Sequence, residues 1–116
     1  MSGKSEKIVI RLSGDTMGRG DDELGKRLIN SFLNVLNESS KTPEAVVLFN
    51  SGVKLACEGA STLEALNDLS EKGVTILNCG TCLNHFGLNK KLRVGKESNM
   101  YEITETMMNA DKVIPL

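Results

Sequence analysis

The sequence contains no tryptophan, and aromatic residues make up only 3% of its 116 residues. The side chains on which single-stranded nucleic acids stack are therefore nearly absent. A charge excess of one sign is also lacking, because 14 basic residues are balanced by 15 acidic ones. Such a balance provides no field to attract nucleic acid or an anionic membrane. We expect neither as a partner.

Long apolar runs are missing as well. None approaches the ~20 residues needed to cross a bilayer, and residues 1–7 are polar, without the apolar core of a signal sequence. We therefore expect a cytoplasmic protein of one domain. Thiols stay reduced in the cytoplasm, so the three cysteines indicate chemistry or metal binding before a structural disulfide.

Apolar, β-rich runs alternate with helical patterns along the whole chain. This alternation predicts an α/β fold, with a mostly parallel five-stranded sheet and helices on both faces. The expected strands are residues 8–12, 45–49, 74–77, 92–94 and 112–116. The expected helices begin at Asp21 or Asp22, at Ser61, after Cys79 and at Asn99, and the third ends at Gly87.

Helical periodicity and caps support three of these helices. The apolar face of the first is expected to comprise Leu24, Leu28, Phe32, Leu33 and Leu36. The second is expected to begin with a capping box of Ser61 and Glu64, and to pack through Leu63, Leu66 and Leu69. The last has Asn99 as its cap and Glu102 at the box position, and is expected to pack through Met100, Ile103 and Met107.

In a parallel sheet, the loops beyond the carboxyl ends of the strands form the binding crevice. Three loops qualify here: residues 13–20, 50–59 and 78–81. All three cysteines lie in or just after the last two loops. We expect the substrate-binding residues of the crevice to be Asp15, Met17, Gly18, Asn50, Ser51, Gly52, Gly80 and Thr81.

Cys79 and Cys82 are the expected catalytic pair. Cys79 would end the third strand, and Cys82 would lie in the first turn of the following helix. Free N–H groups and the helix dipole favour negative charge there, so a thiol is expected to ionise more readily than usual. A second thiol three residues away can then attack the modified first one. The alternative is a pair of small buried side chains.

Other residues near the pair allow different interpretations. Cys57 either joins the site as a third thiol or, as we favour, packs beneath its loop. His85 would complete a Cys₃His zinc set or act as a proton partner, but a plain surface histidine is the preferred interpretation. We expect no metal and no cofactor. Residues 14–20 do not match G-x-G-x-x-G, so a crevice wall is favoured over a phosphate loop.

With these residues identified, the chain resembles the DsrE-like sulfurtransferase family. It is most similar to the C-terminal domain of the YedF group, described as sulfurtransferase-like selenium-metabolism proteins. The resemblance rests on segments that run in order along the chain: residues 17–21 with Leu24-Gly25, 49–55, 79–83 with 86–88, 99–103 and 110–114.

The resemblance implies a three-layer, Rossmann-like DsrE domain over residues 1–116. It implies a symmetric oligomer (dimer, trimer or hexamer) and sulfur donor and acceptor proteins as partners. It also implies an active cysteine, carried as a persulfide, after the third strand. That position is Cys79, with Cys82 as helper. YedF-type proteins commonly carry an upstream TusA-like domain, which we do not expect here.

Three hypotheses for function follow. The first, which we favour, is a sulfur-relay protein with a persulfide on the Cys79–Cys82 loop. The second is a dithiol–disulfide oxidoreductase using the same pair. A thioredoxin fold is disfavoured, because the only proline after the motif is Pro115 at the end of the chain. The third is a non-enzymatic binding module in which the cysteines are incidental.

Overall fold

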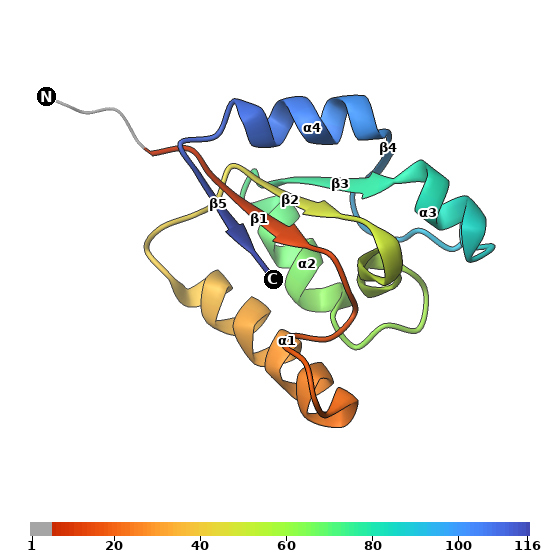
Figure 1. The fold of residues 1–116 in the computed structure, drawn as a ribbon. Helices are drawn as coiled ribbons and strands as arrows, with labels where there is room; N and C mark the ends of the chain where they lie inside the picture. Colours follow the sequence, from red (N-terminus) through yellow and green to blue (C-terminus); the bar gives the residue numbers. More distant parts are fainter. Residues whose placement is uncertain (1–5) are drawn as a thin grey trace, which may run out of the picture.

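The chain folds into one five-stranded sheet flanked by helices (Figure 1). This computed structural model describes residues 6–116, so most of the polar segment 1–7 lies outside the described residues. All neighbouring strands are parallel, in the order β4-β3-β2-β1-β5, which confirms the expected α/β sheet. The elements are β1 (Ile8–Leu12), α1 (Asp22–Glu38), β2 (Ala45–Leu48), the 3-10 helix η1 (Asn50–Ala56), α2 (Leu63–Glu71), β3 (Thr75–Cys79), α3 (Gly80–His85), β4 (Lys96–Ser98), α4 (Met100–Met108) and β5 (Lys112–Pro115).

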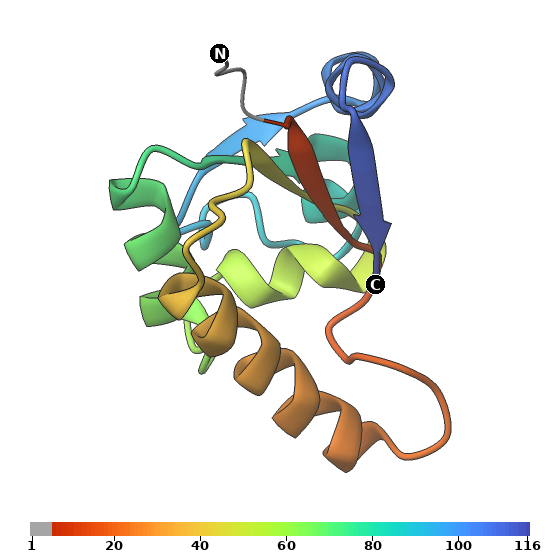
Figure 2. The same ribbon diagram turned by 90° about the vertical axis from the view of Figure 1, so that its left-hand side faces the viewer.

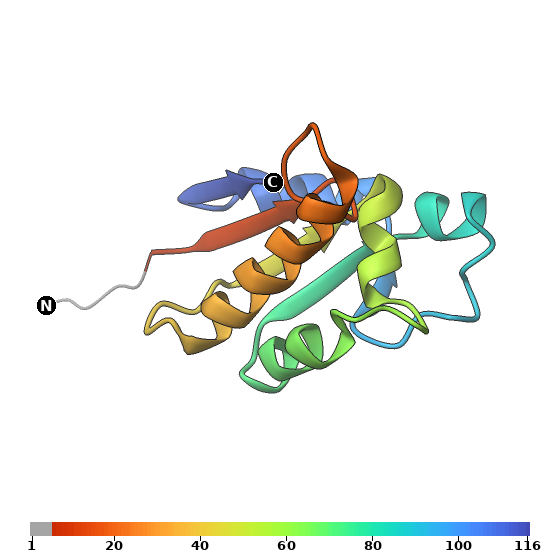
Figure 3. The ribbon, with the colours of Figure 1, turned by 90° about the horizontal axis from the view of Figure 1, so that it is seen from below.

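The helices form layers on both faces of the sheet. Helix α4 covers one face, whereas α1, α2 and η1 cover the other (Figures 1 and 2). The view from below shows α1, η1 and α2 in front of the strands (Figure 3). Among residues 6–116, no helix is both long enough and apolar enough to pass through a membrane.

The carboxyl ends of β1, β2 and β3 lie at the same edge of the sheet. Strands β2 and β3 are fully buried apart from Thr75, as continuous apolar runs covered on both faces should be. η1 follows β2 there and α3 follows β3, so these two short helices lie together beyond the sheet edge (Figure 1).

The fourth strand was predicted in the wrong place. Residues 92–94 are not a strand of the sheet; instead Leu92 forms an isolated antiparallel bridge with Cys57. The N–H groups of Arg93 and Val94 both donate to the carbonyl of Ala56. The sheet edge is completed by β4, after Gly95 has turned the chain with a φ of +80°.

The buried faces of α1 and α4 also differ from the prediction. Helix α1 buries Gly25, Ile29 and Leu33, and leaves Leu24 and Leu28 exposed at 52% and 41%. Of the predicted face, Leu33 is fully buried and Phe32 and Leu36 pack against the core, so the prediction is wrong for Leu24 and Leu28 alone. In α4 the prediction is confirmed for Ile103, which is buried, and for Met107, which packs against the core, whereas Met100 is 51% exposed.

The two expected capping boxes have different outcomes. The Asn99 side chain accepts the Glu102 N–H at 2.8 Å, which confirms the cap of α4. The box at Ser61 does not form, since α2 begins later, at Leu63. The Ser61 hydroxyl instead contacts the Asn30 side chain of α1, and the Thr62 hydroxyl donates to the carbonyl of Leu55 at 2.7 Å.

Candidate functional site

Cys79 lies at the junction of β3 and α3. It is the last residue of the strand and the N-cap residue of the helix, as predicted. Cys79 is in register with Ser98 of β4, and only 3% of it is exposed. A molecule in solution therefore has little access to this thiol.

Cys82, one turn further on, is the accessible member of the pair. It is half-buried, and its Sγ accepts a hydrogen bond from the backbone N–H of Asn50 at 3.0 Å. The thiol lines a pocket of about 310 Å³ together with Asn50, Thr81, His85 and Phe86. The structure thus brings three expected site residues, Cys82, Asn50 and Thr81, around one opening.

Electrostatics at Cys82 differ from the sequence expectation. Burial raises the pKa of the Cys82 thiol above its ordinary value, and a hydrogen bond with the Cys79 thiol raises it further. The Asn50 N–H lowers the pKa in part, because it stabilises the thiolate. The expectation of an easily ionised thiol is therefore wrong for the resting protein. Helix α3 has only six residues, and burial is the largest cause of the raised pKa of Cys82.

The position of Asn50 follows from a close contact between η1 and β1. A Cβ on Gly52 would lie 2.3 Å from the carbonyl oxygen of Leu12, so glycine is required for this approach. η1 begins at Asn50, two residues after the end of β2, and Asn50 has a φ of +53° there. The Asn50 side chain accepts the Ser51 N–H at 2.8 Å and closes this turn. In this conformation the Asn50 N–H points at Cys82.

Gly80 allows a different close approach beside the cysteines. A Cβ at this residue would lie 2.9 Å from both the Glu97 carboxylate and the Ser98 carbonyl. The start of α3 is therefore packed tightly against β4. Glu97 lies next to the Cys79–Cys82 segment, and the sequence pattern had not indicated this carboxylate.

The loop at residues 13–20 lies partly apart from the cysteines. The Met17 N–H donates to the Gly25 carbonyl at 3.0 Å, and a Cβ on Gly25 would lie 2.7 Å from the Thr16 Cβ. Met17 and Gly18 therefore lie along α1, and neither lines the Cys82 pocket. Asp15 is tied to η1, since its N–H donates to the Ser51 Oγ at 3.2 Å. It lines a larger, neighbouring pocket.

The structure also bears on the proposed third thiol, Cys57, and on the zinc set that Cys57 would form with His85 and the other two cysteines. Cys57 is 2% exposed, and its Sγ donates to the Val53 carbonyl at 3.2 Å. Burial raises the pKa of this thiol, and the charge of Arg93 lowers it in part. Within residues 6–116, no three His, Cys, Asp or Glu side chains gather in a way that could hold a metal ion. The hypothetical Cys₃His zinc set is therefore not assembled.

Comparison with known proteins identifies the family. The DsrE/DsrF-like family pattern matches residues 25–116. The chain belongs to the DsrE/DsrF-like family. A comparison with curated protein sequences gives no match.

Solved structures show the same DsrE-like fold. The ychN protein of E. coli has 21% identity and a TM-score of 0.69, with 97% of this chain and 100% of that chain covered. MTH1491 of Methanobacterium thermoautotrophicum, a protein of unknown function, has 18% identity and a TM-score of 0.69, with the same coverage. BT1422 of Bacteroides thetaiotaomicron, a conserved protein of unknown function, has 20% identity and a TM-score of 0.68, with 96% and 95% covered.

Sequence analysis did not single out Phe86, Lys54 or Lys26. Phe86 lines both the Cys82 pocket and the larger one, and the Lys54 ammonium lies 4.6 Å from the centroid of its ring. Lys54 and Phe86 both occur in segments that carry the family resemblance, which was the only signal for them. Lys26 had none, because charged residues on an exposed helix face are common.

Proposed function

We propose that this DsrE-like protein carries sulfane sulfur as a persulfide on Cys82, with Cys79 as the neighbouring helper thiol. The observation that carries the proposal is the Asn50 N–H directed at the sulfur of Cys82, a half-buried residue that lines a pocket. A backbone N–H so placed stabilises the negative charge on the Cys82 sulfur when it is the attacking thiolate. Family membership supports sulfur chemistry at this loop.

Uptake of sulfur needs one deprotonated thiol. The Cys82 thiolate attacks the outer sulfur of a donor persulfide, R–S–SH, and forms a new S–S bond. The donor's S–S bond breaks and its thiolate leaves, so the donor is reduced to a thiol as Cys82 becomes a persulfide, and no external oxidant is consumed. His85, the only histidine in the chain, lines the same pocket and is available to take the Cys82 proton.

In this proposal the roles of Cys79 and Cys82 are the reverse of those that the sequence favoured. Cys79 was the expected carrier, but its burial at 3% exposure supports a helper role. As helper, the Cys79 thiol attacks the inner sulfur of the Cys82 persulfide. This forms a Cys79–Cys82 disulfide and releases sulfide. The oxidoreductase hypothesis uses the same disulfide, but it needs no sulfur adduct.

The test is intact-mass measurement after incubation with inorganic polysulfide. We expect an adduct of about 32 Da, one sulfur atom, to accumulate on Cys79→Ser, whereas on the wild type the helper thiol converts part of the adduct to the Cys79–Cys82 disulfide. Cys57→Ala is the matched control and should keep the adduct. Loss of the adduct in Cys82→Ser completes the expected pattern. An adduct that persists in Cys82→Ser and disappears in Cys79→Ser would overturn the assignment, and no adduct at all would overturn the function.

The proposal also covers the oligomeric state of the protein and its location in the cell. We propose that the protein forms a homo-oligomer, supported by exposed apolar side chains on two helices, among them Leu24, Leu28, Met100 and Met108. Sedimentation equilibrium showing only a monomer would contradict this. We place the protein in the cytoplasm, where thiols stay reduced. Donor and acceptor proteins, a YedF-type identity and a role for selenium are proposed from the resemblance alone.

A further inference from the structure

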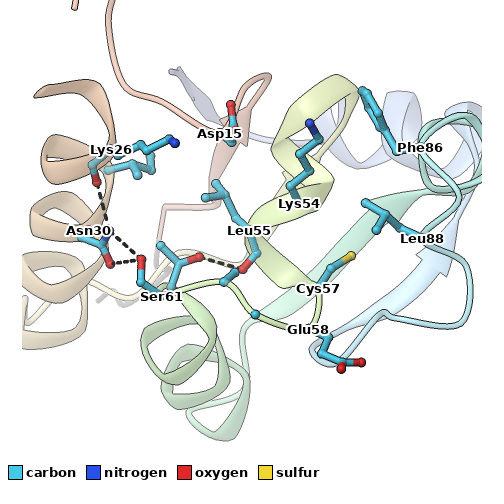
Figure 4. Close-up of a pocket in the computed structure, with 14 residues that line it drawn as sticks. Asp15, Lys26, Asn30, Lys54, Leu55, Cys57, Glu58, Ser61, Phe86 and Leu88 are labelled. Carbon is cyan, nitrogen blue, oxygen red and sulfur yellow. Dashed lines mark hydrogen bonds between the residues drawn. The ribbon is translucent and has the colours of Figure 1, made fainter. Parts of the chain in front are cut away.

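A second, larger pocket lies beside the Cys82 site. It has a volume of about 470 Å³ and is lined by α1, η1, the segment between η1 and α2, and the segment after α3 (Figure 4). Pockets that bind small molecules typically measure about 300–1,000 Å³. Its apolar lining comes from Ile29, Leu55, Ala60, Phe86 and Leu88.

Three charged side chains from three different segments reach this pocket. They are Asp15 from the loop after β1, Lys26 from α1 and Lys54 from η1, and Figure 4 shows them along one side of it. The ion pairs formed among residues 6–116 involve none of the three. Glu58, the other acid lining the pocket, is paired with Arg93 at 2.6 Å. Within the described part of the chain, the pocket therefore offers two free cations and one free carboxylate.

Phe86 connects this pocket to the reactive thiol. Its ring lines both openings, and the Lys54 ammonium lies 4.6 Å from the ring centroid. Lys54 and Asn50 are four residues apart on η1, a distance of about 8 Å along a 3-10 helix. The Asn50 N–H in turn contacts the Cys82 sulfur at 3.0 Å. A ligand held at Lys54 thus needs only a short arm to reach Cys82.

We propose that this pocket binds a small acidic thiol of dipeptide to tripeptide size, which exchanges sulfur with Cys82. Two carboxylates of the ligand pair with Lys26 and Lys54, and an ammonium group pairs with Asp15. A three-residue peptide spans about 10 Å when extended, a length comparable with the rise of about 8 Å along η1 between Lys54 and Asn50. The binding step stands on the pocket alone, whereas the exchange step rests on the function proposed above.

The exchange step is a simple displacement. The ligand arrives as its persulfide, and the Cys82 thiolate attacks the outer sulfur. The ligand's S–S bond breaks, its own thiolate leaves, and that thiolate takes up the proton released from the persulfide. No oxidant or reductant is consumed. The pocket's role is to hold the leaving thiol so that its sulfur faces Cys82.

Binding is tested with S-methylglutathione, which has the two carboxylates and the ammonium but cannot exchange sulfur. Isothermal titration should show binding to the wild type and equal binding to Cys82→Ser. Lys26→Gln and Lys54→Gln should each weaken binding about fivefold or more, since each removes one ion pair. Lys41→Gln, a lysine outside the pocket that carries the same charge change, is the control and should bind like the wild type.

Transfer is tested by comparing two donors, glutathione persulfide and inorganic polysulfide. We expect the two lysine variants to slow transfer from glutathione persulfide and to leave transfer from polysulfide unchanged. No binding of S-methylglutathione, or equal binding to the lysine variants, would overturn the site even if polysulfide still loads Cys82. Lysine-dependent binding with no adduct from either donor would instead overturn the exchange and the proposed function.

Discussion

The backbone N–H of Asn50 donates to the Cys82 sulfur at 3.0 Å, across 32 residues of sequence. The donor comes from the helix that follows β2, and the acceptor from the helix that follows β3. Asn50 has a φ of +53°, a conformation that most residues avoid. The contact therefore depends on a backbone geometry maintained by the packing of η1 against β1.

Replacing Cys79 with alanine should lower the pKa of Cys82. Burial is the main cause of the raised pKa, and the Cys79 thiol adds to it through a hydrogen bond and through charge repulsion once ionised. Alanine removes both of these added effects. At neutral pH Cys82 is mainly protonated, so its alkylation by iodoacetamide should speed up as pH rises. The Cys79→Ala profile should lie at lower pH than that of the wild type. Cys57→Ala should leave it in place, and an unchanged profile in Cys79→Ala would contradict the coupling.

Substitutions at Asn50 should separate backbone strain from the hydrogen bond. Alanine at a positive φ costs about 1–2 kcal/mol, whereas glycine has no such cost. Both variants lose the side-chain contact with the Ser51 N–H and keep the backbone N–H. We expect Asn50→Gly to be more stable than Asn50→Ala by about 1 kcal/mol in urea unfolding. Equal stabilities would show that Asn50 does not hold this conformation in solution.

Gly52→Ala should both destabilise the protein and disturb the thiol. Its Cβ would lie 2.3 Å from the Leu12 carbonyl oxygen, which forces η1 away from β1. Overpacking of this kind costs about 1–3 kcal/mol. The displaced Asn50 N–H would no longer lower the Cys82 pKa, so the alkylation profile should move to higher pH. Gly14→Ala is the matched control, because its Cβ would have an ordinary 3.6 Å contact.

Asn78→Asp should make stability depend strongly on pH. Asn78 is fully buried, and its amide donates to the carbonyls of Val94 at 3.1 Å and Lys96 at 3.3 Å. A carboxylate facing two carbonyls should cost about 3 kcal/mol or more at neutral pH. Burial would raise the pKa of the introduced carboxyl group above its unfolded value. The protonated carboxyl is tolerated better than the carboxylate, so the variant should lose stability as pH rises above the unfolded pKa and recover it below that value.

Urea unfolding at pH 4 and pH 7 measures this difference. Asn67→Asp is the control, since residue 67 is exposed on α2. The urea midpoint of the Asn78→Asp variant should be lower at pH 7 than at pH 4, relative to this control. Parallel behaviour of the two variants would mean that Asn78 is not buried against the two carbonyls.

Most strands of the sheet and the position of Cys79 at the end of β3 were predictable from local sequence patterns. β2 is an unbroken apolar run, β3 has the apolar pair Ile76 and Leu77 after Thr75, and Cys79 is the last residue of β3. The cap of α4 needed only the side chain of Asn99 and the N–H of Glu102. Interactions of this kind lie within a few residues of one another, so the sequence shows them directly.

The other parts of the fold and of the site depend on contacts between segments that are far apart in the sequence. β4 is the polar sequence Lys-Glu-Ser, which has no apolar run to mark it, and it is a strand because it pairs with Leu77–Cys79. The direction of the loop at residues 13–20 follows from its contact with Gly25. The exposure of Cys82 and the burial of Cys79 depend on how η1 and β4 pack around α3. No local pattern encodes these arrangements.

The place of β5 has a consequence for synthesis of the protein. β1 pairs on one side with β2 and on the other with β5, which comes from the far end of the sequence. The Leu116 carbonyl also accepts hydrogen bonds from the N–H and hydroxyl of Ser13. A nascent chain thus exposes one unpaired hydrogen-bonding edge of β1 until β5 leaves the ribosome. Before that, the edge is open to pairing with other chains, and chaperone contact or aggregation at this stage would depend on how fast the segment between β2 and β5 is translated.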